Sequence, residues 1–188
     1  EGRDRGAFVL AFRNEPTARP TAGEKAPMAI TADEFKAALA SWASGVTIIT
    51  ARAGDRIHGM TVSDFSGASL APPLALVCAS KTSNTTALIQ EGRCFGVNVL
   101  RAGQNALSNK FASKKEEWTR FEGVETFSSK TGAPLLADAL VNLDCRLVAV
   151  HEAGDHLLCV GEIESSHVRE GEPLLYFRAS YGRFQKDA

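Results

Sequence analysis

Apolar residues near the start of the chain recur at helical spacing in the stretch TADEFKAALASWASG, residues 31–45. Thr31 and Glu34 precede them at the spacing of a capping box, in which each side chain bonds the other residue's backbone amide. The pattern stops at Gly45, a residue type that commonly ends helices. These signals predict a helix of about three turns, with its apolar positions at Phe35, Leu39 and Trp42.

From Val46 onward the pattern changes to β-branched runs interrupted by turn residues, which is typical of strands. The runs VTIIT, IHGMTVSDFS and LALVCAS are separated by the turn-forming stretches RAGDR and LAPP. We therefore expect three strands in quick succession.

Helical and strand-like segments follow one another through the middle of the chain. After the polar stretch KTSNTT, ALIQEG predicts one or two helical turns ending at Gly92, RCFGVNVL predicts a strand, and GQNALSNKFAS predicts a helix. The next stretch, KKEEWTRFEG, is rich in charge. We expect it to be a mobile connector whose charged side chains face solvent.

The last third of the chain returns to the strand pattern, with two long strands hinged at EAGD and a third after REGEP. About six or seven strands with short helices, and no repeated strand–helix units, predict a mainly β, antiparallel barrel rather than a doubly wound sheet. The strand before EAGD is expected to have one buried face. Its buried residues would be Val141, Leu143, Cys145 and Leu147, alternating with Asn142, Asp144 and Arg146.

Composition narrows the class of protein. The chain has 188 residues, 44% of them hydrophobic, which suits one globular domain with a substantial core. Its 21 Lys and Arg residues are scattered among 22 Asp and Glu residues, so we expect no nucleic-acid partner. No apolar run approaches the length that spans a bilayer. We predict an irregular N-terminal arm over residues 1–28, with Met28 as a candidate natural start, and one domain over residues 29–188.

The cysteines and the standard motifs exclude several kinds of chemistry. Each of the four cysteines lies in an apolar, strand-like run without a C-x-x-C pair, which indicates buried thiols in a reducing compartment, the cytoplasm, and no metal site. His151 and His156 flank a turn without completing a metal-binding pattern. The usual dinucleotide loop, phosphate loop and nucleophile elbow are absent. The cysteines are Cys78, Cys94, Cys145 and Cys159.

Two hydroxyl-rich segments, TVSDFS and SKTSNTT, lie at predicted strand ends. Hydroxyls and turn amides can bind a phosphate, and a helix beginning near Thr85 would add its positive N-terminus while Lys81 adds a formal charge. The same residues also suit a simple cap and turn, because SNTTA is a good helix start. An anion site and a structural cap both stay open.

Several blocks in order resemble the flavin reductase family with the FMN-binding split-barrel fold, whose members are reductase components of two-component flavin monooxygenases. The resemblance covers roughly residues 35–182. It rests on FKAALASWASGVTIIT, HGMTVSDFSGASLAPPLALVCASKTSNTT, CFGVNVL, LSNKFA, AGDHLLCVGEI and PLLYFRASYG.

The resemblance implies an antiparallel Greek-key split barrel, a homodimer, and FMN or FAD bound near the subunit boundary. It also assigns roles to residues. Thr61, Val62, Ser63 and Asp64 would line the flavin ring and ribityl chain; Ser80, Lys81, Thr82, Ser83, Asn84 and Thr85 would bind the phosphate; Phe111 would lie near the outer flavin or its adenosine; His156 would face the nicotinamide, with Tyr176 near the same face.

The implied activity is hydride transfer from NADH or NADPH to the flavin, which is then released for a separate oxygenase. A flavin-binding carrier without turnover is the alternative. One departure stands out, because Asp64 occupies a position where the family more often has a small or amide residue. A carboxylate there would disfavour a negatively charged reduced ring or phosphate unless it points to solvent or bonds a neighbour.

Overall fold

The computed structural model describes residues 29–186, so the arm predicted over residues 1–28 lies outside the described residues. Three helices are present in the described part: α1 (Ala32–Ala40), α2 (Asn84–Gly92) and α3 (Asn105–Ala112). None of the helices between residues 29 and 186 is long and apolar enough to cross a membrane.

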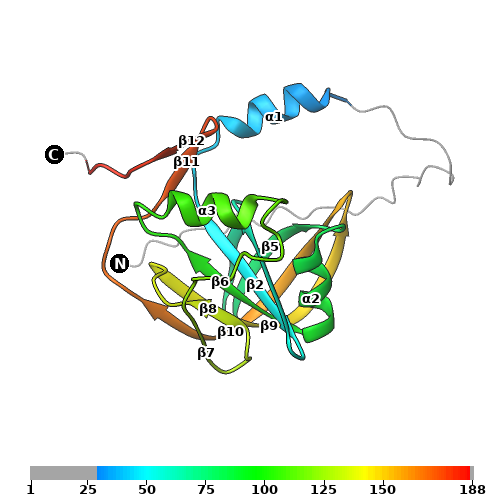
Figure 1. Cartoon of the computed structure of the whole chain (residues 1–188). Helices are drawn as coiled ribbons and strands as arrows, with labels where there is room; N and C mark the ends of the chain where they lie inside the picture. Colours follow the sequence, from blue (N-terminus) through cyan, green and yellow to red (C-terminus); the bar gives the residue numbers. More distant parts are fainter. Residues whose placement is uncertain (1–28, 187–188) are drawn as a thin grey trace, which may run out of the picture.

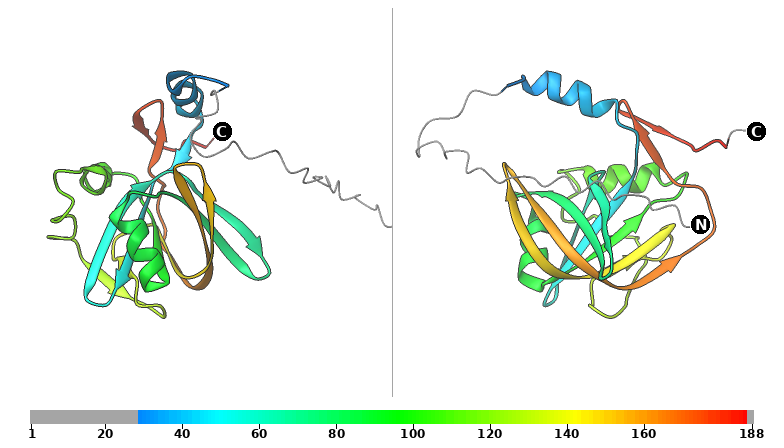
Figure 2. Two further views of the ribbon diagram at one scale, coloured as in Figure 1. Left: turned by 90° about the vertical axis from the view of Figure 1, so that its right-hand side faces the viewer. Right: turned by 180° about the vertical axis from the view of Figure 1, so that it is seen from behind.

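Seven antiparallel strands form the main sheet, in the order β3-β2-β6-β9-β10-β5-β4 (Figure 1). Its edge strands β3 and β4 are joined by only Ser63 and Asp64, so the sheet has to roll up until its two edges meet. The result is the predicted split barrel, seen from two further sides in Figure 2. The strands are β2 (Thr47–Ala53), β3 (Arg56–Val62), β4 (Phe65–Leu70), β5 (Pro73–Ser80), β6 (Cys94–Val99), β9 (Val141–Ala153) and β10 (His156–Val168).

Two small sheets lie outside the barrel. A three-stranded sheet in the order β1-β11-β12 joins the segment after α1 to the C-terminal region. A hairpin of β7 and β8 follows the connector after α3. These strands are β1 (Ser44–Gly45), β7 (Thr126–Ser128), β8 (Pro134–Leu136), β11 (Leu175–Phe177) and β12 (Ser180–Gly182).

The helix predicted in residues 31–45 is present with its capping box: Glu34 N donates to Thr31 Oγ1 over 3.2 Å, and Thr31 N donates to Glu34 Oε2 over 2.8 Å. It is shorter than predicted, because it ends at Ala40, so that Trp42 lies beyond it and Gly45 belongs to β1. The stretch IHGMTVSDFS was expected to be one strand and instead forms β3 and the start of β4. Ser63 and Asp64 turn the chain between them, because the two halves pair with opposite edges of the sheet.

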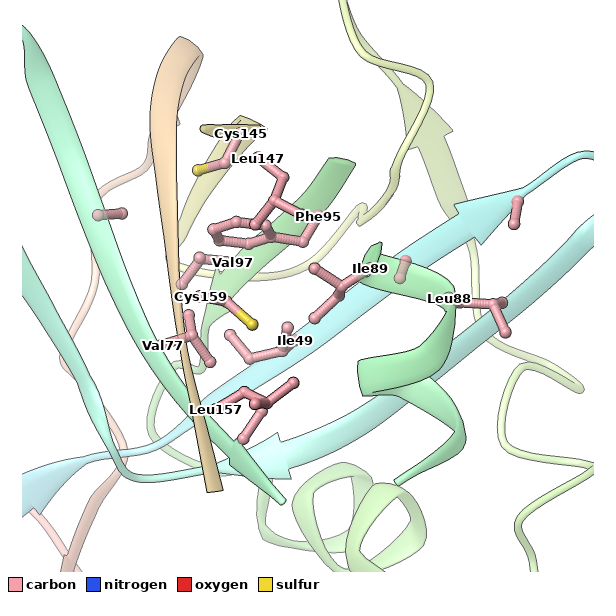
Figure 3. Packing of buried hydrophobic residues seen from close by; sticks show 14 residues of the cluster. Ile49, Val77, Leu88, Ile89, Phe95, Val97, Cys145, Leu147, Leu157 and Cys159 are labelled. Atoms are coloured by element: carbon pink, nitrogen blue, oxygen red, sulfur yellow. The ribbon is translucent and has the colours of Figure 1, made fainter. Parts of the chain in front are cut away.

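Apolar side chains from the strands and from α2 fill the barrel (Figure 3). Phe95 is fully buried at its centre and packs directly against Gly161. A Cβ at Gly161 would lie 2.5 Å from the Phe95 ring, so only glycine fits this position of β10. Leu88 and Ile89 bring α2 into the same core, which fixes the start of that helix relative to the strands.

The buried face predicted for β9 is only partly confirmed, because Cys145 and Leu147 are buried whereas Val141 and Leu143 are half-buried. Two of its polar positions are not a surface either. Asn142 and Asp144 are completely buried, since the β7–β8 region covers the outer side of the strand. Asn142 Nδ2 donates to Asn98 Oδ1 over 2.8 Å, and Asp144 accepts from Thr131 N over 2.8 Å. Buried polar groups are tolerated when their hydrogen bonds are made, so polar residues here mark an internal network rather than a surface.

All four cysteines lie in the described region and are free thiols. Three are buried as predicted, whereas Cys78 is half-buried. Burial raises the pKa of Cys145 to about 12 and that of Cys159 to about 11. These thiols therefore stay protonated and act as small apolar core residues.

Candidate functional site

Four chain segments meet at one end of β5: the β3–β4 junction, the turn after β5, the start of α2 and the tip of the β9–β10 hairpin. His156 is the register partner of Ser80, and Lys81 N donates to Asp155 O over 3.1 Å. Cys78 N donates to Asp64 O over 3.0 Å, which brings the junction alongside β5. The fold therefore gathers both hydroxyl-rich segments and His156 in one region.

The turn between β5 and α2 contains a cap and a separate set of free hydroxyls. Ser83 is the N-cap of α2 and accepts from Thr85 N over 3.2 Å, while its own hydroxyl donates to Met60 Sδ over 3.1 Å. Ser80 Oγ and Thr82 Oγ1 lie 3.1 Å apart. Capping thus uses only one hydroxyl of the segment, and the others lie at the positive end of a helix dipole.

Lys81 is exposed beside this turn, where its Nζ lies 3.2 Å from Glu152 Oε2. The Glu152 side chain is 81% exposed, so the ion pair is worth little in water. Lys81 can therefore leave it to neutralise an anion bound at the start of α2.

His156 begins β10 and projects beside Ser80, with its side chain 38% exposed. Its Nδ1 lies 2.8 Å from Asp155 Oδ1. The hydrogen bond from His156, together with the ring's positive charge when protonated, holds the pKa of Asp155 below its usual value. The pairing orients the imidazole and leaves Nε2 as the ring nitrogen that can meet a ligand.

A cavity of about 270 Å³ opens on the other side of the β3 end, against α3 and β12. Thr61 and Ser63 line it on the barrel side, and Tyr176 and Tyr181 line it on the side of the small sheet. The Tyr181 hydroxyl donates to Asn109 Oδ1 over 2.7 Å and lies 3.0 Å from Ser108 Oγ. Thr61 and Ser63 were predicted to line the flavin ring and Tyr176 to lie near the His156 face, and all three line this cavity. Tyr181, Ser108 and Asn109 were not predicted, because no motif marks them.

Val62 and Asp64, the other two residues predicted to line the flavin, differ in what they offer a ligand. The Val62 carbonyl accepts from Thr47 Oγ1 over 2.6 Å, so part of its backbone is already used. The Asp64 side chain is exposed. Water solvates this carboxylate, so its negative charge repels a nearby anion only weakly. The departure of Asp64 from the family pattern is therefore compatible with flavin binding.

Two predicted site residues have side chains that are buried inside the fold. Phe111 is fully buried, packing against Gly59 and, with ring centroids 5.2 Å apart, against Phe121. Thr85 is also fully buried, and its hydroxyl lies 2.7 Å from His58 Nδ1. Phe111 is thus a core residue beneath β3. The Thr85 side chain is likewise packed inside the fold, where a ligand cannot reach it.

The connector after α3 is not the freely solvated segment that its charges predicted. The buried Arg120 guanidinium donates to Gly59 O and Ser113 O, each over 2.8 Å. Glu117 Oε1 accepts from Asn84 Nδ2 over 2.8 Å, at the first residue of α2. A run of mixed charge looks solvated in a sequence, and only the fold reveals that Glu117 and Arg120 anchor it.

His58 lies buried between the connector and α2. Its Nε2 is 3.3 Å from Glu117 Oε1 but lacks hydrogen-bond geometry. Burial, and secondarily the positive charge of Arg120, lower the pKa of His58, while Glu117 opposes the shift. The ring is therefore held neutral beneath the first turn of α2.

Residues 39–185 match the family model described as "Flavin reductase like domain". An NADH-dependent flavin reductase of Rhodococcus sp. is 39% identical over 164 residues, covering 86% of this chain and 90% of that protein. The reductase subunit of a flavin-dependent monooxygenase of Rhodococcus jostii is 36% identical over 166 residues, covering 88% and 84%. Among solved structures, an NADH:FAD oxidoreductase of Streptomyces globisporus, in complex with NAD and FAD fragments, has a TM-score of 0.78 at 30% identity, covering 83% of this chain and 94% of that one.

Proposed function

Since this chain belongs to the flavin reductase like domain family, we propose that it is an NAD(P)H-dependent flavin reductase that supplies reduced FMN or FAD to a separate monooxygenase. The observation that carries the proposal is the meeting of the Ser80–Asn84 turn, the β3–β4 junction and His156 at one end of β5. A flavin and a nicotinamide have to lie face to face, and this region provides groups suited to each.

The donor set fits a flavin. The phosphate would lie at the start of α2, where the helix dipole, Thr82 and Lys81 favour an anion. The ring would lie against the β3 end near Thr61 and Ser63, beside the cavity of about 270 Å³. This volume is slightly below the usual range for ligand pockets, about 300–1,000 Å³, so the cavity would hold only part of the ring.

The chain's own task is positioning, because bound flavin supplies the redox chemistry by taking up a hydride from the reduced nicotinamide. Asp155 fixes the orientation of the His156 ring, which would donate to or accept from the nicotinamide carboxamide. Exposed hydroxyls hold the phosphate through hydrogen bonds that break readily in water, which suits a flavin that has to leave as a product.

NAD(P)H oxidation with added flavin tests the proposal directly. We expect the protein to oxidise NADH or NADPH, followed at 340 nm, only when FMN, FAD or riboflavin is added in catalytic or substrate amounts. An absence of turnover with all three flavins would refute the enzyme assignment. A tightly bound yellow cofactor that ignores both nicotinamides would indicate the carrier instead.

His156→Ala should raise the KM for NADH about tenfold, because it removes one hydrogen bond to the docked nicotinamide. The Kd for flavin should change less than twofold, since His156 does not belong to the phosphate turn. Asp155→Asn is the matched control, as it keeps a hydrogen-bond acceptor beside Nδ1. An unchanged KM in His156→Ala would remove the docking role.

The chain is further proposed to form a homodimer through α1. No residue of this helix is buried. Its apolar residues Phe35 and Leu39 are 54% and 50% exposed, and Trp42, two residues beyond its end, is 76% exposed. An apolar helix face of this kind is normally covered. Sedimentation should show a dimer that Leu39→Glu converts to monomers and Lys36→Ala, on the same helix, does not; a monomeric wild-type protein would contradict the proposal.

The relatives named as reductase subunits of monooxygenases support a separate oxygenase as the consumer of the reduced flavin. In a coupled assay, this chain with NADH and flavin should support substrate oxidation by such an oxygenase held behind a dialysis membrane. Product formed across the membrane would indicate free diffusion of reduced flavin, and product formed only on direct mixing would indicate a protein–protein complex.

A further inference from the structure

Trp118 lies on the connector between two anchors. One residue before it, Glu117 accepts the hydrogen bond from Asn84 at the start of α2; two residues after it, Arg120 is buried and bonded to Gly59 O and Ser113 O. The backbone that carries Trp118 is therefore held in place next to the first turn of α2.

The indole itself is 81% exposed. Among the described residues, its only aromatic neighbour is His58. The two rings meet edge to face, with centroids 6.0 Å apart and planes at 72°. His58 in turn is 2.7 Å from Thr85, in the first turn of α2. A large apolar ring is thus fixed beside the proposed phosphate position with a face open to solvent, which is costly unless something covers it.

The charges around Trp118 favour a neutral partner. Lys114 and Lys115 are exposed and carry two positive charges, and the adjacent Glu116 and Glu117 carry two negative ones. The surface around the indole therefore has no net charge with which to hold an anion on the ring itself. A flat, neutral, aromatic group that stacks on the indole is the chemistry that fits.

We propose that Trp118 is the stacking platform for the adenine ring of FAD, and that it gives this chain a preference for FAD over FMN. The inference rests on the proposed function, which puts the flavin phosphate at the start of α2. FAD continues beyond that phosphate through a second phosphate to an adenosine, whereas FMN ends there. Asn84 connects the two places, because it begins α2 and bonds the residue next to Trp118.

The test compares FAD and FMN affinities in the full-length protein by flavin fluorescence titration without nicotinamide. Trp118→Leu should weaken FAD binding about 5- to 150-fold, the range of one base–aromatic stack, and weaken FMN binding less than twofold. Trp118→Phe should restore most of the FAD affinity. Phe184→Leu, which removes another exposed aromatic ring far along the chain, should leave the FAD/FMN ratio unaltered.

Three results would overturn the inference. Equal weakening of FAD and FMN would make Trp118 a general support of the site. A rise in the KM for NADH, with FMN as acceptor and no change in FAD affinity, would assign the platform to the adenine of the nicotinamide cofactor. Loss of the dimer in Trp118→Leu would assign the indole to the subunit interface. The proposed reductase function fails separately, through absence of NAD(P)H oxidation in the wild-type protein.

Discussion

Asn98 and Thr82 are polar residues at strand ends whose surroundings differ in every respect. Asn98 is completely buried and makes four hydrogen bonds, to Ile48 O, Thr50 Oγ1, Leu136 N and Asn142 Nδ2. Thr82 is exposed, and its partner is another hydroxyl of the same turn. The first cluster is complete without a ligand, whereas the second offers donors at the positive end of a helix. A structural network differs from a binding site less in its polarity than in whether its hydrogen-bonding groups already have partners within the protein.

The largest expected effect is on stability, in the buried network. Asn98→Ala would leave the Leu136 amide and one of the two N–H groups of Asn142 Nδ2 without their acceptor, and would remove the donor to Ile48 O. Each buried group left unpaired costs about 1–3 kcal/mol. We expect the free energy of unfolding to fall by about 3–5 kcal/mol in urea denaturation. A loss below about 1 kcal/mol would mean that water or neighbours replace the bonds.

The matched substitution in the exposed turn should act on binding instead. Combining Ser80→Ala with Thr82→Ala should weaken FMN binding about tenfold, through loss of hydrogen bonds to a charged phosphate, and change stability by less than about 0.5 kcal/mol. Fluorescence titration and urea denaturation of one preparation measure both. Ser66→Ala, an exposed hydroxyl on β4, is the control, and an equal loss of affinity there would show that any surface serine has the same effect.

A smaller effect is expected from His58, which lies between the buried core and the exposed turn. Its pKa in the folded protein is below the usual 6.5, so at pH values just under 6.5 the unfolded chain binds a proton that the folded chain does not. Stability therefore falls as the pH falls through that window. His58→Asn should flatten this part of the stability curve between about pH 7 and pH 5; an identical slope in both proteins would contradict the assignment.

Local signals were enough to predict much of the fold. The spacing of Thr31 and Glu34 alone predicted the start of α1, and the EAGD turn predicted the β9–β10 hairpin. Caps and tight turns can be predicted because they depend on residues near one another in the chain. The barrel followed from strand number and the lack of repeated strand–helix units. The bend at Ser63 and Asp64 escaped prediction, since only pairing with distant β5 divides that run into two strands.

The site could be predicted only where its residues belong to a recognisable segment. Ser80–Asn84 and His156 were predicted in that way, and the fold brings them together, although their roles in binding stay predictions. Phe111 shows the limit, because its apolar ring suited either a ligand or the core, and the close approach of Gly59 decides for the core. Glu117 could not be singled out in a charged run, because its hydrogen bond joins it to Asn84 of α2, 33 residues away in the chain.

The difference between FMN and riboflavin binding in the wild-type protein tests the central claim most directly. Riboflavin shares the ring and ribityl chain but lacks the phosphate, so only a phosphate site can separate the two ligands. If the turn before α2 holds the phosphate, fluorescence titration should give a Kd for FMN at least about tenfold below that for riboflavin, with a gap that shrinks at high salt. Equal affinities at low salt would contradict the account and leave the exposed hydroxyls as no more than a turn and a helix cap.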